Sequence, residues 1–217
     1  MMNNEFLKRI LSSIVLIPIT LFFIAKGSFL FNCFLLICLL ATIYEWRVLT
    51  RNRFHKISGY VFILISYYFV YLLRNDFDGK YTLFFLILLI CVSTDLGGYI
   101  FGKIFKGPKL IKISPNKTYA GMIGAFVLSI ISTSIYLNYY EFFIIKKAEI
   151  LSFYDFIFVI LISSVSQLGD IIISYFKRKS KIKNTGKIIP GHGGILDRID
   201  GMIFAFPSSY LILKAIY

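Results

Sequence analysis

Charged residues are scarce in this sequence of 217 residues, because they make up only 16% of it, against about 25% in an ordinary soluble domain. Acids are the rarest of them: Asp and Glu number 11, whereas Lys and Arg number 24. Hydrophobic residues account for 58% of the chain, and the mean hydropathy is +0.77. This composition excludes an ordinary soluble domain and indicates an integral membrane protein.

The chain also lacks the features that divide a protein or build a cysteine site. Its three cysteines, Cys33, Cys38 and Cys91, lie in apolar runs without metal-ligand spacing, which is typical of buried small hydrophobes. There is no internal repeat, low-complexity tract or Pro-rich linker. We therefore expect residues 1–217 to form a single membrane-embedded domain.

Apolar segments near the ~20 residues that a helix needs to cross a bilayer recur along the whole chain. This pattern predicts an all-α, polytopic membrane helix bundle with about seven transmembrane helices, and six or eight are the alternatives. The first segment follows a basic flank, but the next begins so soon afterwards that we expect a retained span rather than a cleaved signal. The segments cover about residues 10–25, 29–49, 58–73, 82–102, 121–140, 153–178 and 195–216.

Lysine and arginine are distributed unevenly among the connections between these segments. With seven spans, seventeen of them lie on one side of the membrane and six on the other. The positive-inside rule then predicts a cytoplasmic N-terminus and an outer C-terminus in the cell (inner) membrane. The same rule, together with anionic lipid, accounts for the basic excess, so we expect no nucleic-acid partner.

Four of the eleven acids stand apart from those in polar loops or at the outer ends of the apolar segments. Asp95 is in "STDLGGYIFGK" and Asp170 in "SQLGDIIISYFKR", while Asp197 and Asp200 open the last segment. A helix rises 1.5 Å per residue, which places each acid within roughly 10 Å of the cytoplasmic boundary. Isolated charges at that depth are unfavourable by a few kcal/mol each, so we expect these acids to meet cations, water or one another.

The spacing of these acids points to a metal site. Asp197 and Asp200 are three residues apart and share one helix face, while Arg198 points elsewhere. With Asp170 from a neighbouring helix they would form an oxygen-rich cluster suited to Mg²⁺ or another divalent cation. The alternative is an Asp/Arg ion-pair network inside the bundle.

The stretch "PGHGGILDRID" leads into the last segment. Gly193 and Gly194 permit close approach of the backbone to a phosphate, and the helix N-terminus that follows adds partial positive charge. The alternative is a plain loop before a helix start, where Asp is favoured by the helix dipole. Three roles are open for His192, namely general base, phosphate donor or structural hydrogen bonder.

Most lysines of the chain have the default interpretation of a solvated, cytoplasmic flank. Better candidates for binding phosphate are Lys117 in "SPNKTYAG" and the pair Lys177 and Arg178. These side chains adjoin a turn-rich loop or the carboxylates.

The stretch "SYFKRKSKIKNTGKIIPGHGGILDRID" closely resembles the C-terminal signature of phosphatidate cytidylyltransferases (CDP-diacylglycerol synthases). Two upstream stretches, "DLGGYIFGK" and "SPNKTYAG", agree with the same family, so the resemblance covers at least the second half of the chain. The signature positions that match are Ser174, Lys177, Arg178, Lys183, Gly186, Pro190, His192, Gly193, Gly194, Asp197, Arg198 and Asp200.

The resemblance implies a membrane-embedded catalytic domain that transfers the cytidylyl group of CTP to phosphatidate, giving CDP-diacylglycerol and pyrophosphate. The lipid phosphate is already ionised at neutral pH, so its attack needs no strong general base. Membrane lipid supplies one substrate, and the oligomeric state, a homo-oligomer included, is open. The implied catalytic residues are Asp170, Asp197, Asp200, His192, Lys177 and Arg178; the substrate-binding residues Lys117, Lys183, Arg198, Ser114, Gly193 and Gly194; and the metal ligands Asp170, Asp197, Asp200 and Asp95.

Three positions depart from the family pattern. Asn184 replaces a usual Asp, Ala120 a usual Glu, and Ile173 a common Glu. These losses leave open a catalytically weakened structural relative. A cation or proton transporter that uses the intramembrane acids is the other alternative, although a transporter site should lie near the membrane midplane and these acids cluster at one face.

Overall fold

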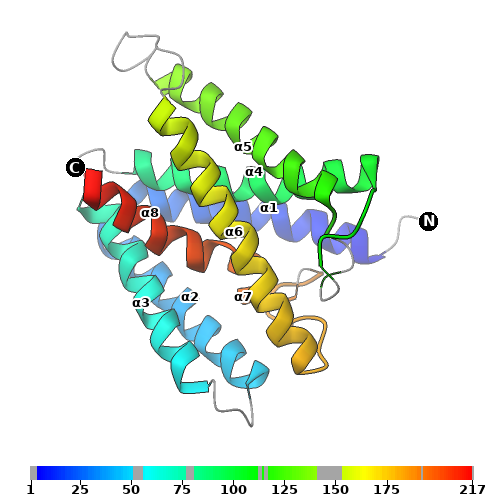
Figure 1. Ribbon diagram of the computed structural model, residues 1–217. Helices are drawn as coiled ribbons and strands as arrows, with labels where there is room; N and C mark the ends of the chain where they lie inside the picture. The colour runs from blue at the N-terminus through cyan, green and yellow to red at the C-terminus, as the bar shows by residue number, and fades with distance from the viewer. Residues whose placement is uncertain are drawn as a thin grey trace.

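The computed structural model of the protein describes residues 4–50, 56–76, 81–111, 114, 117–140, 153–191 and 193–216. These ranges form eight α-helices and no β-strand (Figure 1). The helices are α1 (Asn4–Lys26), α2 (Ser28–Leu49), α3 (Lys56–Asn75), α4 (Thr82–Phe105), α5 (Tyr119–Tyr140), α6 (Phe153–Lys179), α7 (Leu196–Ile199) and α8 (Met202–Ile216).

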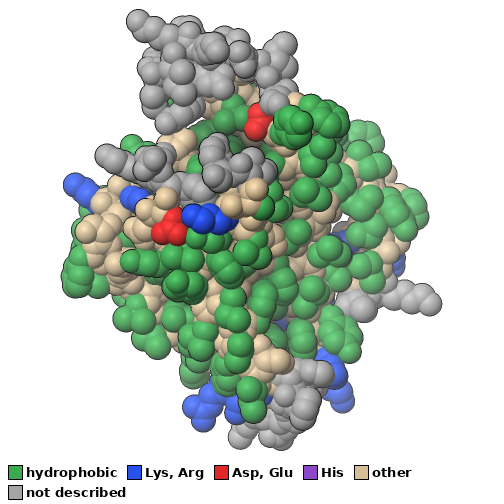
Figure 2. Space-filling model, turned by 60° about the vertical axis from the view of Figure 1, so that its left-hand side comes forward, with side chains coloured by type: hydrophobic (Ala, Val, Ile, Leu, Met, Phe, Trp, Pro, Cys, Tyr) green, Lys and Arg blue, Asp and Glu red, His purple; other side chains and the backbone are tan. Residues whose placement is uncertain are grey.

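Five of these helices, α2 to α6, are long and apolar enough to cross a membrane. The apolar stretches Ile14–Lys26 of α1 and Met202–Ala215 of α8 are shorter. Large apolar side chains also cover the outside of the bundle, as Figure 2 shows for one face; Phe29 is 75% exposed and Ile135 is 64% exposed. The prediction of an all-α, polytopic membrane bundle is confirmed.

The last predicted segment differs from expectation, since the structure divides it into α7 and α8. The division falls at Asp200 and Gly201. A Cβ atom at Gly201 would lie 2.5 Å from the Oγ atom of Ser166 in α6, so the two backbones approach more closely than a larger residue would permit. This close crossing sets the position of the acids around it.

Helices α4 and α5 form a tight antiparallel pair. A Cβ atom at Gly97 would lie 2.4 Å from the carbonyl oxygen of Gly124, and one at Gly121 would lie 2.7 Å from that of Gly98. Small residues on facing helices allow this approach in membranes. The pair brings the C-terminal half of α4, with Asp95, next to the start of α5.

Two clusters of buried apolar side chains hold the bundle together. The larger one includes Phe31, Leu73, Phe84, Ile87 and Phe206 from four helices. The second joins the end of α2 to α6 and to the α7–α8 segment, and its members are Trp46, Leu49, Ile63, Tyr67, Ile173, Leu196 and Ile203. This second cluster therefore fixes α7 against α2.

Candidate active site

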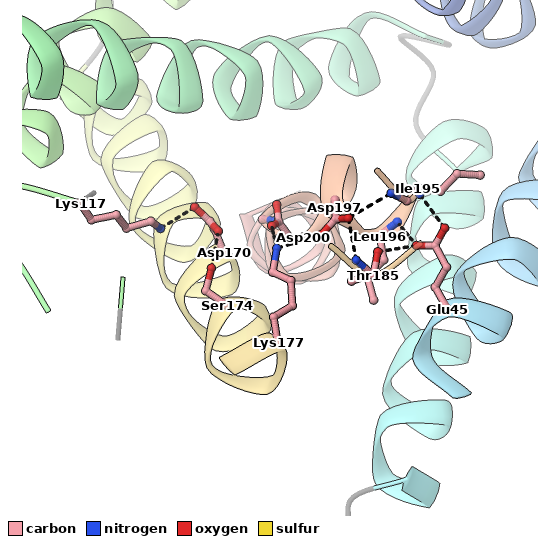
Figure 3. A network of polar contacts seen from close by, with 12 residues as sticks. Glu45, Lys117, Asp170, Ser174, Lys177, Thr185, Ile195, Leu196, Asp197 and Asp200 are labelled. Carbon is pink, nitrogen blue, oxygen red and sulfur yellow. Dashed lines mark hydrogen bonds and ion pairs between the residues drawn. The ribbon is translucent and has the colours of Figure 1, made fainter. Parts of the chain in front are cut away.

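The site is built where α6 crosses the α7–α8 segment. A Cβ atom at Gly169 would lie 2.9 Å from the carbonyl oxygen of Asp200. Because Asp170 follows Gly169 directly, this contact places the Asp170 and Asp200 carboxylates side by side (Figure 3). Two acids that are thirty residues apart in the sequence are thus neighbours in the structure.

On the α6 side of the site, Asp170 pairs with a lysine from the loop before α5. The Nζ atom of Lys117 lies 2.6 Å from Oδ2 of Asp170 and also donates to the carbonyl of Gln167 at 3.3 Å. The Oγ atom of Ser174, one helical turn further along, donates to Oδ1 of Asp170 at 3.2 Å. The side chains of Lys117 and Asp170 are 23% and 29% exposed, so this pair is open to a ligand.

On the α7 side, Lys177 reaches two acids at once. Its Nζ atom lies 2.9 Å from Oδ1 of Asp197 and 3.6 Å from Oδ2 of Asp200. The other oxygen of Asp197 accepts the backbone N–H groups of Thr185 at 2.8 Å and Gly194 at 3.0 Å. The prediction that Asp197 and Asp200 share one face agrees with their common contact to Lys177.

The two acids of the α7 segment, which lies outside the five long apolar helices, have opposite pKa shifts. Burial alone would raise the pKa of Asp197, but the Gly194 amide, the Lys177 ammonium and the Thr185 amide hold it below its usual range. Burial raises the pKa of Asp200 well above its usual range, and the Asp170 carboxylate raises it further, although Lys177 opposes this. The protein thus stabilises the charged form of Asp197, whereas Asp170 and burial disfavour the charged form of Asp200.

These groups line one cavity of about 380 Å³. Its walls come from the C-terminal half of α4, the start of α5, the end of α6 and the α7 segment. Ser114 and Thr118 add hydroxyl groups from the loop before α5. Its charged lining residues are Asp95, Lys117, Asp170, Lys177, Asp197, Arg198 and Asp200. All four predicted acids and three predicted cations therefore meet around one space.

The structure places Arg198 differently from the helix-face argument. We expected it to point away from Asp197 and Asp200, yet it lines the same cavity. The reason is that α7 has only four residues and ends at the crossing with α6, so cavity surrounds more than one of its faces. That expectation is wrong.

Several other predicted residues lie away from the cavity. Arg178 and Lys183 are exposed on the surface and do not line it. Gly193 and Gly194 are buried under it, and a Cβ atom at each would meet Oδ2 of Asp197 and an oxygen of Glu45, respectively. The predicted close backbone approach therefore occurs toward carboxylates of the protein. His192 lies outside the described residues.

Sequence reasoning missed Glu45, which is completely buried at the end of α2. Its carboxylate accepts the Thr185 hydroxyl at 2.7 Å and the amides of Ile195 and Leu196 at 2.8 Å each. The available signal was a lone acid in the apolar stretch "ATIYEWRVLT". Such an acid needs several hydrogen-bond donors when it is buried.

The residues present suit a divalent cation that is shared with a ligand. Within the described part of the chain, no three His, Cys, Asp or Glu side chains are grouped closely enough to hold a metal by themselves. Mg²⁺, however, commonly uses one or two carboxylates and takes its other oxygens from water and substrate phosphates. The adjacent carboxylates of Asp170 and Asp200 match this donor set, because a bound cation would offset the repulsion between their charged forms.

The three departures from the family pattern have different surroundings. Asn184 lines the cavity, and Ala120 is half-buried in the first turn of α5. Ile173 is 2% exposed and packs with Trp46 and Leu196, so an apolar residue fits this position without leaving a buried acid unpaired. None of the three replacements removes one of the four acids around the cavity.

Comparison with known proteins agrees with the predicted resemblance. The model of the cytidylyltransferase family matches residues 62–216. A phosphatidate cytidylyltransferase of Rickettsia conorii is 35% identical over 212 residues, which cover 96% of this chain and 90% of that protein. The protein of the same name from Rickettsia typhi is 33% identical over 208 residues, covering 92% and 88% of the two chains.

A phosphatidate cytidylyltransferase of Staphylococcus saprophyticus is 35% identical over 174 residues, which cover 78% of this chain. The match spans 64% of that longer relative. The family match runs from within α3 to the end of α8 and so includes α4, α5, α6 and α7, which line the cavity. The chain therefore belongs to the cytidylyltransferase family.

Proposed function

We propose that this protein transfers the cytidylyl group of CTP to phosphatidate and releases pyrophosphate, forming CDP-diacylglycerol. The observation that carries the proposal is the cavity in which Lys117, Lys177 and Arg198 face four acids. Cations in such a space suit phosphates, and acids beside them suit a metal that accompanies a nucleotide. The identity of the two substrates is inferred from the names of the relatives.

In the proposed step, an oxygen of the phosphatidate phosphate forms a bond to the α-phosphorus of CTP. The bond from the α-phosphorus to the oxygen that bridges to the β-phosphate breaks, and its electron pair leaves with pyrophosphate. The attacking oxygen is already ionised, so no side chain has to remove a proton. The chain's contribution is positioning and neutralisation of charge, which dominate phosphoryl-type transfers.

The residues divide this work between the two sides of the cavity. Lys117 and Arg198 bind phosphate oxygens, while Lys177 holds Asp197 and Asp200 in place through its two contacts. Asp170 and Asp200 would hold Mg²⁺, which supplies neutralisation of the triphosphate when it is bound. Asp95 lines the same cavity from α4, where it would orient a cation or a lysine.

We place the cavity at the cytoplasmic face of the inner membrane. It lies where α4 ends, α5 begins and α6 ends, and the connections at this end are the most basic in the sequence. Figure 1 shows the two termini at opposite ends of the bundle, as an odd number of spans requires. At this depth a lipid phosphate and a nucleotide from the cytoplasm can meet.

The test is an assay of the purified protein in detergent micelles that contain phosphatidate, with CTP labelled at the α-phosphate and Mg²⁺. The expected result is transfer of the label to a lipid, with release of one pyrophosphate for each CDP-diacylglycerol. Absence of labelled lipid from protein that elutes as a folded, monodisperse species would contradict the proposal. Transfer of the label to another acceptor lipid would contradict the assignment of phosphatidate.

A further inference from the structure

Glu45 is the acid most completely removed from solvent around the site, with 0% exposure. It lies near the end of α2, about 140 residues before the loop that it contacts. A buried carboxylate is strongly unfavourable unless donors compensate it. Here three donors do so: the hydroxyl of Thr185 and the backbone amides of Ile195 and Leu196.

The loop backbone is shaped around this carboxylate. A Cβ atom at Gly194 would lie 2.2 Å from Oε2 of Glu45, and one at Gly186 would lie 2.8 Å from Oε1. Both positions therefore need glycine for the backbone to reach Glu45. The amides at the start of α7 donate hydrogen bonds to this side chain, so they are not available to an external anion.

The same loop residues connect Glu45 to Asp197 (Figure 3). Thr185 gives its hydroxyl to Glu45 and its amide to Asp197. At the other end of the loop, the amide of Gly194 donates a hydrogen bond to Asp197, and the next two amides donate to Glu45. Glu45 and Asp197 thus bind both ends of this loop, at residue 185 and at residues 194–196, and Asp197 also pairs with Lys177. We call the hydrogen bonds of Glu45 to Thr185, Ile195 and Leu196 the clamp.

We infer that Glu45 is a positioning residue for cytidylyl transfer, which acts by fixing the backbone at residues 185 and 194–196 so that Asp197 and Lys177 keep their places at the cavity. This inference rests on the proposed function. Glu45 does not line the cavity, so its effect reaches the substrates only through that loop. Loss of the clamp should therefore reduce turnover more than lipid binding.

The kinetic test compares Glu45→Gln with the control Asp76→Asn. Asp76 also accepts one side-chain hydrogen bond, from Tyr210 at 2.7 Å, but it directly follows α3 and does not line the cavity. Glu45→Gln should lower kcat by about 10- to 100-fold, as expected for a misplacement of about 1 Å, and change the KM for phosphatidate by less than about twofold. Rates are normalised to the folded, monodisperse protein, and Asp76→Asn should keep the wild-type kcat.

A second measurement distinguishes the clamp from a general loss of packing. Thr185→Val, which removes the hydroxyl that joins the clamp, should lower kcat about fivefold in the wild-type background and less than about twofold in the Glu45→Gln background. Independent effects that multiply would overturn the inference. So would a Glu45→Gln protein with wild-type kcat.

A third measurement needs no turnover. Hydrogen exchange of the Ile195 and Leu196 amides should be at least about tenfold faster in Glu45→Gln than in wild type, with unchanged exchange in α4 and α5. If the wild-type protein forms no CDP-diacylglycerol, the proposed function fails and takes the kinetic part of the inference with it. Unchanged exchange at these two amides, with an active wild-type enzyme, would overturn the inference alone.

Discussion

Each side of the cavity has a lysine–aspartate ion pair, but the two pairs serve different roles. On the α6 side, Lys117 and Asp170 form a single ion pair whose side chains are 23% and 29% exposed. On the α7 side, Lys177 and Asp197 are 13% and 7% exposed, and Asp197 accepts two backbone amides in addition. The first pair is open to a ligand, whereas the second is part of the protein's own framework.

This difference shows that a carboxylate's chemistry depends on how many donors the protein already supplies. Asp197 has its charge met by an ammonium and two amides, and its pKa is accordingly lowered. Asp170 instead faces Asp200, whose pKa is raised by burial and by that neighbour. A divalent cation would bind more favourably beside Asp170 and Asp200 than beside the already compensated Asp197. We therefore assign metal binding to Asp170 and Asp200 and a supporting role to Asp197.

The largest expected effect is that of Asp170→Asn. Removing this charge should lower the rate of CDP-diacylglycerol formation by at least about 10³-fold, since electrostatic stabilisation of transferred phosphates is the main catalytic contribution. The thermal midpoint in detergent should fall little, because the pair with Lys117 is partly exposed. A variant that keeps more than a tenth of the wild-type rate would contradict the assignment.

Asp197→Asn should lower both activity and stability, which distinguishes it from Asp170→Asn. Breaking a buried ion pair with two backbone contacts is unfavourable by about 3 kcal/mol, which corresponds to a fall of roughly 6 to 12 °C in the thermal midpoint for a chain of this size. Activity should be lost while the protein still inserts in the membrane. Normal turnover in this variant would sink the assignment of Asp197, and an unchanged midpoint would contradict its place in the framework.

Lys117→Met should have an intermediate effect. Loss of one charge-assisted contact to a phosphate should raise the KM for CTP or phosphatidate by about 10-fold or more. The measurement is a set of initial rates with each substrate varied in turn. If kcat falls while both KM values stay the same, Lys117 does not bind substrate in the ground state.

The smallest effects are expected at Arg178 and Lys183, which the sequence signature includes but which lie outside the cavity. Arg178→Gln and Lys183→Gln should each lower kcat/KM by less than about threefold at physiological ionic strength, because exposed charges there are screened. A loss above about tenfold in either variant would show that the substrate site extends beyond the cavity to these two side chains.

The helices could be predicted from the sequence because long apolar runs have few alternatives in a bilayer. The predicted segments agree with α2 to α6 within a few residues. The division of the last segment at Gly201 could not be predicted, since it depends on the contact with Ser166 of another helix. Local spacing carries no information about such a contact.

The acids of the cavity could also be predicted, since charges in apolar segments are rare enough to be informative. What spacing could not provide was the set of partners for each acid. The turn at Gly193 and Gly194 has the composition of a phosphate loop, but in the structure its neighbouring amides are donated to Asp197 and Glu45. Only the folded chain brings α2 to that loop.

The central claim is tested most directly by the same substitution at two places in α6. Asp170→Asn changes the cavity, whereas Asp155→Asn changes an exposed acid in the first turn of the same helix. Transfer of label from the α-phosphate of CTP to phosphatidate, measured with Mg²⁺ in micelles, should be abolished in Asp170→Asn and match wild type in Asp155→Asn. Equal rates in the two variants would contradict the claim that this cavity carries out the transfer.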